Sequence, residues 1–159
     1  MNIFVLDLCP TKSAQMQHDK HVVKMVLESA QMLCSAFDRD KFDVPYKWAH
    51  YNHPCTAWSR NSHPNFEWLA SHGLALAQEY THRYGKIHKS QAVIDWCLDN
   101  YKLVSMPSDQ LTPFAQCMPD IYKQNSVTKA YQDYYIGTKL NNAKWTNRPI
   151  PSIFREHIN

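Results

Sequence analysis

The residues with the clearest chemical potential lie in the stretch 19–31, DKHVVKMVLESAQ. His21, Lys24, Glu28 and Gln31 follow one another at steps of three, four and three residues, so a helix would place them on one stripe. Glu28 follows Lys24 by four residues and can pair with it. A carboxylate beside cations suits acid–base chemistry or the stabilisation of a cation. The simpler interpretation is a solvated helix face with an ordinary ion pair.

Two other segments bring cations and aromatic rings together. In residues 79–90, EYTHRYGKIHKS, the cations near the expected end of a helix are Arg83, Lys86 and Lys89. The C-terminal segment alternates the same residue types: Tyr134, Tyr135, Lys139, Lys144, Trp145 and Arg148. Such groups can hold phosphates and stack on bases. Alternatively, the first cluster complements a helix dipole, and the second packs its rings and leaves its charges in solvent.

The histidines and cysteines form no recognisable metal motif. His18 and His21 have one-turn spacing, as do His50 and His53, but neither HExxH nor CxxC occurs. The five cysteines are odd in number and irregularly spaced, which favours buried free thiols over disulfides or a nucleophile. No Gly-rich phosphate loop is present. We therefore predict no metal and no cofactor.

Elements that would position these residues are indicated by the apolar pattern. Steps of three and four predict helices over residues 14–37, 64–84, 90–103 and 126–136. Ser62 suits the N-cap of the second helix and Gly85 its C-terminal end, and Gly137 is expected to stop the last helix. Three segments lack this pattern: 2–8 is a short extended segment, 105–119 an ordered loop and 138–159 an extended basic and aromatic tail. We predict an all-α, mainly helical fold, a compact single-domain irregular bundle over residues 1–159.

The composition agrees with a globular protein. Of the 159 residues, 44% are hydrophobic and 19% charged, which is enough apolar material for one domain with a core. The net charge of +3 permits a polyanionic partner without requiring one. No stretch is long and apolar enough to span a membrane, and the N-terminus lacks the features of a signal peptide. We expect a cytoplasmic protein, in the host cytoplasm if a phage encodes it.

One stretch carries a family resemblance. Residues 19–33, DKHVVKMVLESAQML, resemble phage relatives of the pyrimidine-dimer DNA glycosylase/AP lyase family of the endonuclease V type. That family has Asp-x-His in an early helix and a Glu seven residues after the His, a spacing that Asp19, His21 and Glu28 match. Less specific similarities are found at His53, Trp58, Phe66, Trp68, Tyr134, Tyr135, Arg148 and Pro149.

The resemblance implies a fold and a reaction. The fold would be all-α, and the protein would bend DNA, flip a nucleotide and cleave the glycosidic bond of a damaged or modified pyrimidine. In the family the α-amine of the chain attacks the sugar C1′, and here that amine would belong to Met1. Glu28 takes the place of the Glu that supports imine formation and strand cleavage, and His21 that of a neighbouring site residue. The residues expected to contact DNA or a nucleotide are Asp7, Asp19, Lys20, Lys24, His53, Arg83, Lys86, Lys89, Lys144 and Arg148.

Two other functions stay open at this point. The same cations and rings would serve a non-catalytic phage protein that binds and sequesters a signalling nucleotide. They would also serve a glycosidase acting on free nucleotides, in which Glu28 or Asp7 stabilises an oxocarbenium-like sugar. Neither the recognised base nor the oligomeric state follows from the sequence.

Overall fold

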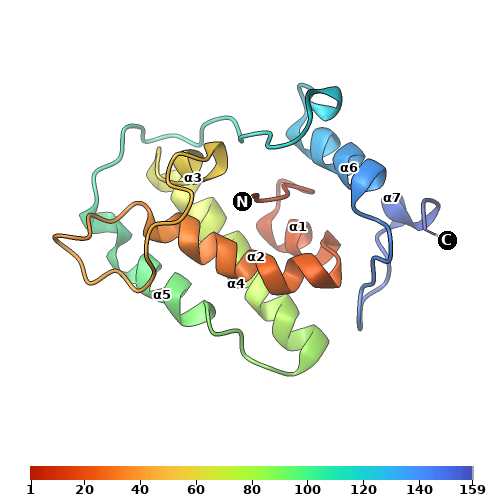
Figure 1. Ribbon diagram of the computed structural model, residues 1–159, viewed down its shortest axis with the longest axis horizontal. Helices are drawn as coiled ribbons and strands as arrows, with labels where there is room; N and C mark the ends of the chain where they lie inside the picture. Colours follow the sequence, from red (N-terminus) through yellow and green to blue (C-terminus); the bar gives the residue numbers. More distant parts are fainter. Residues whose placement is uncertain (159) are drawn as a thin grey trace.

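Residues 1–158 are described by this computed structural model, and helices joined by irregular segments make up their fold (Figure 1). The helices are α1 (Pro10–Met16), α2 (Asp19–Cys34), α3 (Pro54–Ser59), α4 (His63–Tyr84), α5 (Gln91–Asn100), η1 (Tyr101–Leu103), η2 (Asp120–Tyr122), α6 (Val127–Thr138) and α7 (Ser152–Arg155). The β-pairing within this range is one isolated bridge between Ser62 and Ser108. The predicted all-α fold is therefore confirmed.

The long helices α2 and α4 form the centre of the bundle, and α1 and α5 pack against them (Figure 1). Three of these helices meet at Gly73 of α4. A Cβ at that position would lie 2.8 Å from Ile94 Cδ1 of α5 and 3.1 Å from Ser29 Cβ of α2. Since interiors are closely packed, a side chain there would crowd Ile94 and Ser29. The glycine therefore allows the close approach that buries their apolar stripes.

Helix α4 begins and ends where its sequence signals predict. The Ser62 hydroxyl accepts a hydrogen bond from the Asn65 amide at 3.0 Å and caps the helix. Gly85 adopts a φ of 67°, and its amide donates to the Thr81 carbonyl at 2.8 Å. Although α4 has 22 residues, neither it nor any other helix of the described range is both long and apolar enough to cross a membrane.

The single helix predicted over residues 14–37 is wrong, because the chain breaks between α1 and α2. Gln17 is extended, with φ −72° and ψ 139°, and its side chain is buried. The side-chain nitrogen Nε2 of Gln17 donates to the carbonyl oxygens of Ile3 at 3.2 Å and Phe4 at 3.4 Å. His18 then caps α2 by accepting from the His21 amide. A contact with a distant segment therefore outweighs the local helical pattern.

Two other predicted boundaries differ from the structure. Residues 90–103 form α5 up to Asn100 and then tighten into the 3-10 helix η1. Gly137 does not end the last helix but lies inside α6, which continues to Thr138. The ring of Tyr122 packs against the Cα of Gly137, where any Cβ would collide with it. This glycine therefore serves a close contact and not a helix end.

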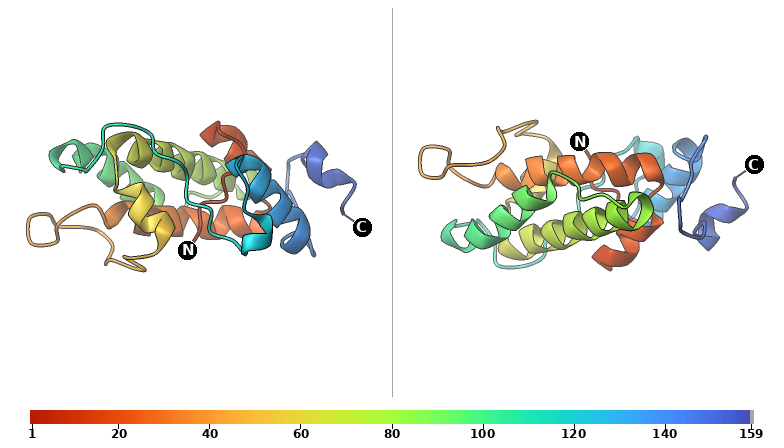
Figure 2. Two further views of the ribbon diagram at one scale, coloured as in Figure 1. Left: turned by 90° about the horizontal axis from the view of Figure 1, so that it is seen from above. Right: turned by 90° about the horizontal axis from the view of Figure 1, so that it is seen from below.

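The segments outside the helices wrap the bundle (Figure 2). Residues 105–119 cross from the α5 end to η2, and they contain no helix. The N-terminal segment enters the interior, where Ile3–Leu6 are buried. Residues 139–151 run over the junction of α1 and α2, where Trp145 Nε1 donates to the Met16 carbonyl at 2.9 Å, and α7 follows. The C-terminal end then packs through Phe154 of α7 on Tyr135 of α6 and on Trp145.

Candidate active site

The N-terminal segment runs along the polar stripe of α2. The Met1 amine nitrogen lies 3.2 Å from Glu28 Oε1, and the Phe4 ring stacks on His21 with centroids 4.2 Å apart. Three extended residues span about 10 Å, and seven helical residues rise about 10.5 Å. The distance between His21 and Glu28 along α2 therefore matches the length of the N-terminal arm, residues 1–4, that lies along them.

Asn2 fixes this arm in place. Its Oδ1 accepts from the amides of Ile3 at 2.8 Å and Phe4 at 3.3 Å, and from the Tyr131 hydroxyl at 2.9 Å. Its Nδ2 donates to the Cys117 carbonyl at 2.8 Å. One side chain therefore joins the arm to α6 and to the 105–119 loop, and it leaves the amine beside it little freedom. Sequence reasoning missed Asn2, because nothing local marks an asparagine at the second position.

Glu28 is a buried carboxylate whose partners are two cations. The residue is 6% exposed, and Lys24 Nζ lies 3.6 Å from Oε2 with its own side chain 68% exposed. Within the described residues, neither carboxylate oxygen accepts a hydrogen bond, so the two ion pairs balance its charge. A buried carboxylate is costly unless it is paired. The charge of the Met1 amine therefore compensates the charge of Glu28. A carboxylate in this position can accept a proton from the amine.

A surface pocket of about 260 Å³ opens at this pair. Its lining contains Met1, Lys24, Leu27, Glu28, Gln31, Ala49 and His50. An amine, a carboxylate and an exposed lysine therefore line one space, which is large enough to admit part of a ligand.

Two exposed aromatic residues are sequence neighbours of the pocket-lining residues and form an aromatic platform. Trp48 and Tyr51 flank the lining residues Ala49 and His50, are 40% and 37% exposed, and stack with centroids 4.6 Å apart. The Arg60 guanidinium lies 3.6 Å from the centre of the Tyr51 ring. Exposed stacked rings with a cation are typical of surfaces that hold bases. The sequence analysis did not select Trp48, Tyr51 or Arg60.

His21 supports the arm and does not line the pocket. Its Nδ1 lies 2.5 Å from the Tyr135 hydroxyl, and its ring is also stacked on His18 at 4.0 Å. Burial, together with the nearby charges of His18, Lys139 and Lys24, lowers the pKa of His21 to about 3. A neutral imidazole held in this way positions Phe4 and, through the arm, the amine.

The buried imidazoles of His18 and His72 and the half-buried one of His21 should reduce stability in mild acid. Burial lowers the pKa of His18 and of His72 to about 4, and that of His21 to about 3. Asp19 opposes this effect at His18, and hydrogen bonds to the Pro10 and Ile3 carbonyls oppose it at His72. Unfolded histidine has a pKa of about 6.5, so above that pH neither state binds these protons. Below about pH 6.5 only the unfolded state binds these protons, until the pH reaches the pKa values that the histidines have in the folded state.

We therefore expect the free energy of unfolding to fall between about pH 6.5 and 4, by roughly 1.4 kcal/mol per pH unit for each histidine. Urea unfolding followed by circular dichroism at several pH values measures this slope. His72→Gln is expected to reduce the slope by about one third. An unfolding free energy that stays constant from about pH 6.5 to 5 would contradict the prediction.

Asp19, Arg83 and Arg148 lie in a network that ties elements together. The Arg83 side chain is 0% exposed and donates to Glu79 Oε2 at 3.0 Å, Asp19 Oδ1 at 3.1 Å and the Gln17 carbonyl at 2.8 Å. Arg148 pairs with the same Glu79. Burial by itself would raise the pKa of Glu79, but the bonds from Arg148 and Arg83 lower it overall. These residues join α1, α2, α4 and the tail, and Arg83 has no surface to offer a phosphate.

The other predicted binding residues are dispersed. Asp7 Oδ1 accepts from the Cys9 amide at 2.8 Å at the start of α1. Exposed lysines that do not line the pocket are Lys20, Lys86, Lys89 and Lys144. His53 caps α3 by accepting from the Cys55 amide. Burial lowers the pKa of His53, as does the charge of the N-terminal amine, so this residue lies close to the pocket.

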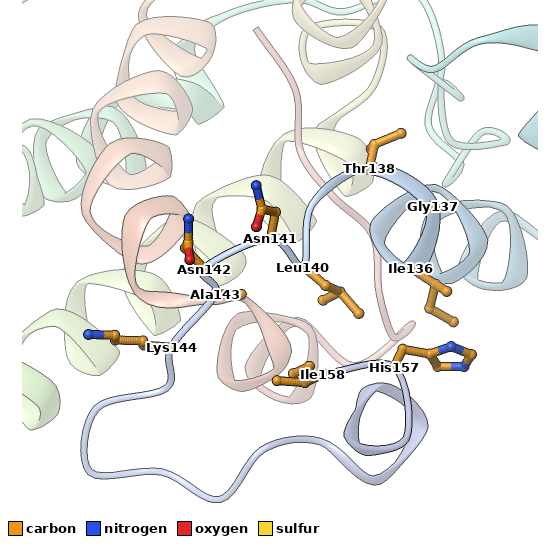
Figure 3. A pocket seen from close by; sticks show the side chains of 10 residues that line it. All are labelled: Ile136, Gly137, Thr138, Leu140, Asn141, Asn142, Ala143, Lys144, His157 and Ile158. Atoms are coloured by element: carbon orange, nitrogen blue, oxygen red, sulfur yellow. The ribbon is translucent and has the colours of Figure 1, made fainter.

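A larger pocket lies beside the C-terminal segment (Figure 3). It has a volume of about 550 Å³ and is formed by the end of α6 and the C-terminal segment. Among its described lining residues, Lys144 and His157 are the titratable ones, and no carboxylate is present. It therefore lacks the pairing of amine and carboxylate that the pocket at Met1 has.

Comparison with known proteins places the site in a family context. The model of one family, described as pyrimidine dimer DNA glycosylase, matches residues 1–92, which is more than half of the chain. The matched region includes the arm, α2, the pocket at Met1 and α4. No curated protein and no solved structure matches the chain significantly.

Proposed function

Since the chain belongs to the pyrimidine dimer DNA glycosylase family, we propose that it is a DNA N-glycosylase with AP lyase activity, acting on a damaged or modified pyrimidine. The observation that carries the proposal is the Met1 amine held 3.2 Å from the buried Glu28 carboxylate. An amine nucleophile beside a base is the arrangement that imine chemistry at a sugar requires. DNA is accordingly the proposed partner.

The reaction assigns a step to each of these groups. The unprotonated Met1 amine attacks C1′ of the damaged nucleotide, the C1′–N glycosidic bond breaks, and the base leaves with its electron pair and takes a proton. Glu28 accepts the proton that the attacking nitrogen loses and returns it to O4′ as the sugar ring opens, which gives a protonated imine and regenerates the carboxylate. Removal of a proton from C2′ then expels the 3′ phosphate and cleaves the strand. Glu28 is placed to serve these proton transfers, because it is the carboxylate in contact with the amine.

The surroundings of the amine suit an extruded nucleotide. A base inside a duplex cannot reach a buried amine, so the target must leave the stack. The 260 Å³ pocket supplies a space beside Met1, and the exposed Lys24 supplies a cation for a phosphate. Trp48 and Tyr51, which flank two of its lining residues in the sequence, supply exposed stacked rings. We propose that these four residues contact the DNA around the target nucleotide.

The direct test is incubation with ultraviolet-irradiated and with abasic duplex DNA in the presence of borohydride. Borohydride reduces an imine to a stable amine, so we expect a covalent protein–DNA adduct with both substrates. Peptide mapping of the adduct should place the link on Met1. Without borohydride, the same substrates should show strand cleavage.

A variant with one extra glycine before Met1 provides the matched control. The added residue moves the free amine away from Glu28, and we expect the adduct to disappear while circular dichroism stays unchanged. An adduct that maps to Lys24 would reject the amine assignment and keep the lyase reaction. A folded protein that gives neither adduct nor strand cleavage would reject the proposed function.

A further inference from the structure

A second group of reactive side chains lies next to the arm and takes no part in the proposed reaction. His53, Cys55 and Cys117 each offer one ligand atom, and all three atoms lie within 4.8 Å of one another. Cys55 is buried, whereas His53 and Cys117 are half-buried. From this geometry we propose that the three residues form a binding site for a thiophilic divalent cation, namely zinc.

The types of ligand decide the class of metal. Two cysteine sulfurs and one imidazole suit Zn²⁺ and disfavour Mg²⁺ and Ca²⁺, which require oxygen ligands. Three protein ligands leave the fourth tetrahedral position to water, as in other Cys₂His zinc sites. The half-buried positions of His53 and Cys117 leave an approach from solvent.

Small movements bring the group to metal-binding geometry. The two sulfurs lie 2.8 Å apart, and tetrahedral zinc would separate them to roughly 3.8 Å. Cys117 belongs to the 105–119 loop, so this separation needs no shift of a helix. The Nδ1 of His53 accepts the Cys55 amide at 3.2 Å, and a metal bound there would replace that one hydrogen bond by a coordinate bond.

A second cysteine pair shows why the histidine matters. Cys34 of α2 and Cys97 of α5 have sulfurs 3.7 Å apart, and both are fully buried. Among the described residues this pair is not part of any group of three metal-ligating side chains. It therefore has the sulfur ligands without the third ligand or an approach from solvent, and it is the natural control.

Zinc at this place would fix the loop that holds the arm. The Cys117 carbonyl accepts from Asn2, and its amide donates to the Tyr131 hydroxyl at 3.1 Å. Coordination would tie Cys117 to the start of α3 and so anchor the partner of Asn2. The site is thus proposed as structural support for the arm, and its existence does not depend on the glycosylase reaction.

The test uses Co²⁺ as a spectroscopic substitute for Zn²⁺. The full-length protein, reduced and stripped with a chelator, is titrated with Co²⁺ without oxygen. We expect thiolate-to-cobalt charge-transfer absorption and intense tetrahedral ligand-field bands that saturate at one equivalent and vanish when Zn²⁺ is added. Zn²⁺ should also raise the midpoint of thermal unfolding. Cys117→Ser, at a half-buried loop position, should weaken Co²⁺ binding by more than about 100-fold.

A control variant tests whether the metal binds at Cys117 or at the second cysteine pair. A Cys34→Ala, Cys97→Ala double variant is expected to keep the cobalt spectrum. Loss of the spectrum in this variant, with retention in Cys117→Ser, would overturn the assignment. So would a wild-type protein with free thiols that binds no Co²⁺. Recovery of a Cys55–Cys117 disulfide from the purified protein would also reject the zinc site and identify an oxidisable pair.

Discussion

Replacing Glu28 by glutamine is expected to reduce the rate of strand cleavage by roughly 10²–10⁴-fold, the range that a positioned acid–base group contributes. Glutamine keeps the size of the side chain but cannot accept the proton that the Met1 amine must lose. DNA affinity should change little, since Lys24 and the aromatic platform remain exposed. Single-turnover cleavage of abasic duplex DNA measures the rate, and fluorescence anisotropy measures the dissociation constant.

The matched control for this variant is Asp95→Asn. Asp95 lies on the exposed face of α5, so the same change of charge occurs away from the pocket. Cleavage by this variant should remain at the wild-type rate. If Glu28→Gln also cleaves at the wild-type rate, Glu28 is not the base and the proposed mechanism fails. A loss of DNA binding equal to the loss of rate would instead assign Glu28 to binding.

Arg83→Met is expected to lower the free energy of unfolding by about 3–5 kcal/mol, as is typical when one partner of a buried ion pair is removed. Arg83 is completely buried and pairs with Asp19 and Glu79. Without it, Asp19 retains Thr146 as a donor and Glu79 retains Arg148, but the carbonyls of Gln15 and Gln17 lose their partners. Urea unfolding at neutral pH measures the change.

An exposed cation provides the comparison for Arg83. Lys86 lies just beyond the end of α4, and Lys86→Met should change the free energy of unfolding by less than about 0.5 kcal/mol. A loss below about 1 kcal/mol in Arg83→Met would contradict the structural role of the network. In that case the earlier interpretation of Arg83 as a phosphate-binding residue would regain support.

Local signals in the sequence were sufficient for the helical class and for the best-defined helix. Ser62 and Gly85 mark the ends of α4 because capping depends on residues only a few positions away. The seven-residue step from His21 to Glu28 likewise placed both side chains on one face of α2, since helical geometry is fixed by the backbone. The family resemblance rested on the same short motif and agrees with the match over residues 1–92.

Contacts between distant segments required the tertiary structure. No local pattern indicates that Gln17 leaves the helix to bind the Ile3 carbonyl, or that Arg83 is buried at the end of α4. The sequence does not distinguish a buried basic residue from an exposed one, because burial depends on which other segments pack over the side chain.

The candidate site shows the same division. The sequence determined that Glu28 lies on the polar stripe of α2. The seven-residue step from His21 to Glu28, whose length matches that of the N-terminal arm, can also be counted from the sequence. Only the fold decided that the Met1 amine lies against Glu28, because Asn2 must first be held by Cys117 and Tyr131, more than 100 residues away. Side chains this far apart in the chain are brought together by the packing of the whole bundle, which short-range propensities do not encode.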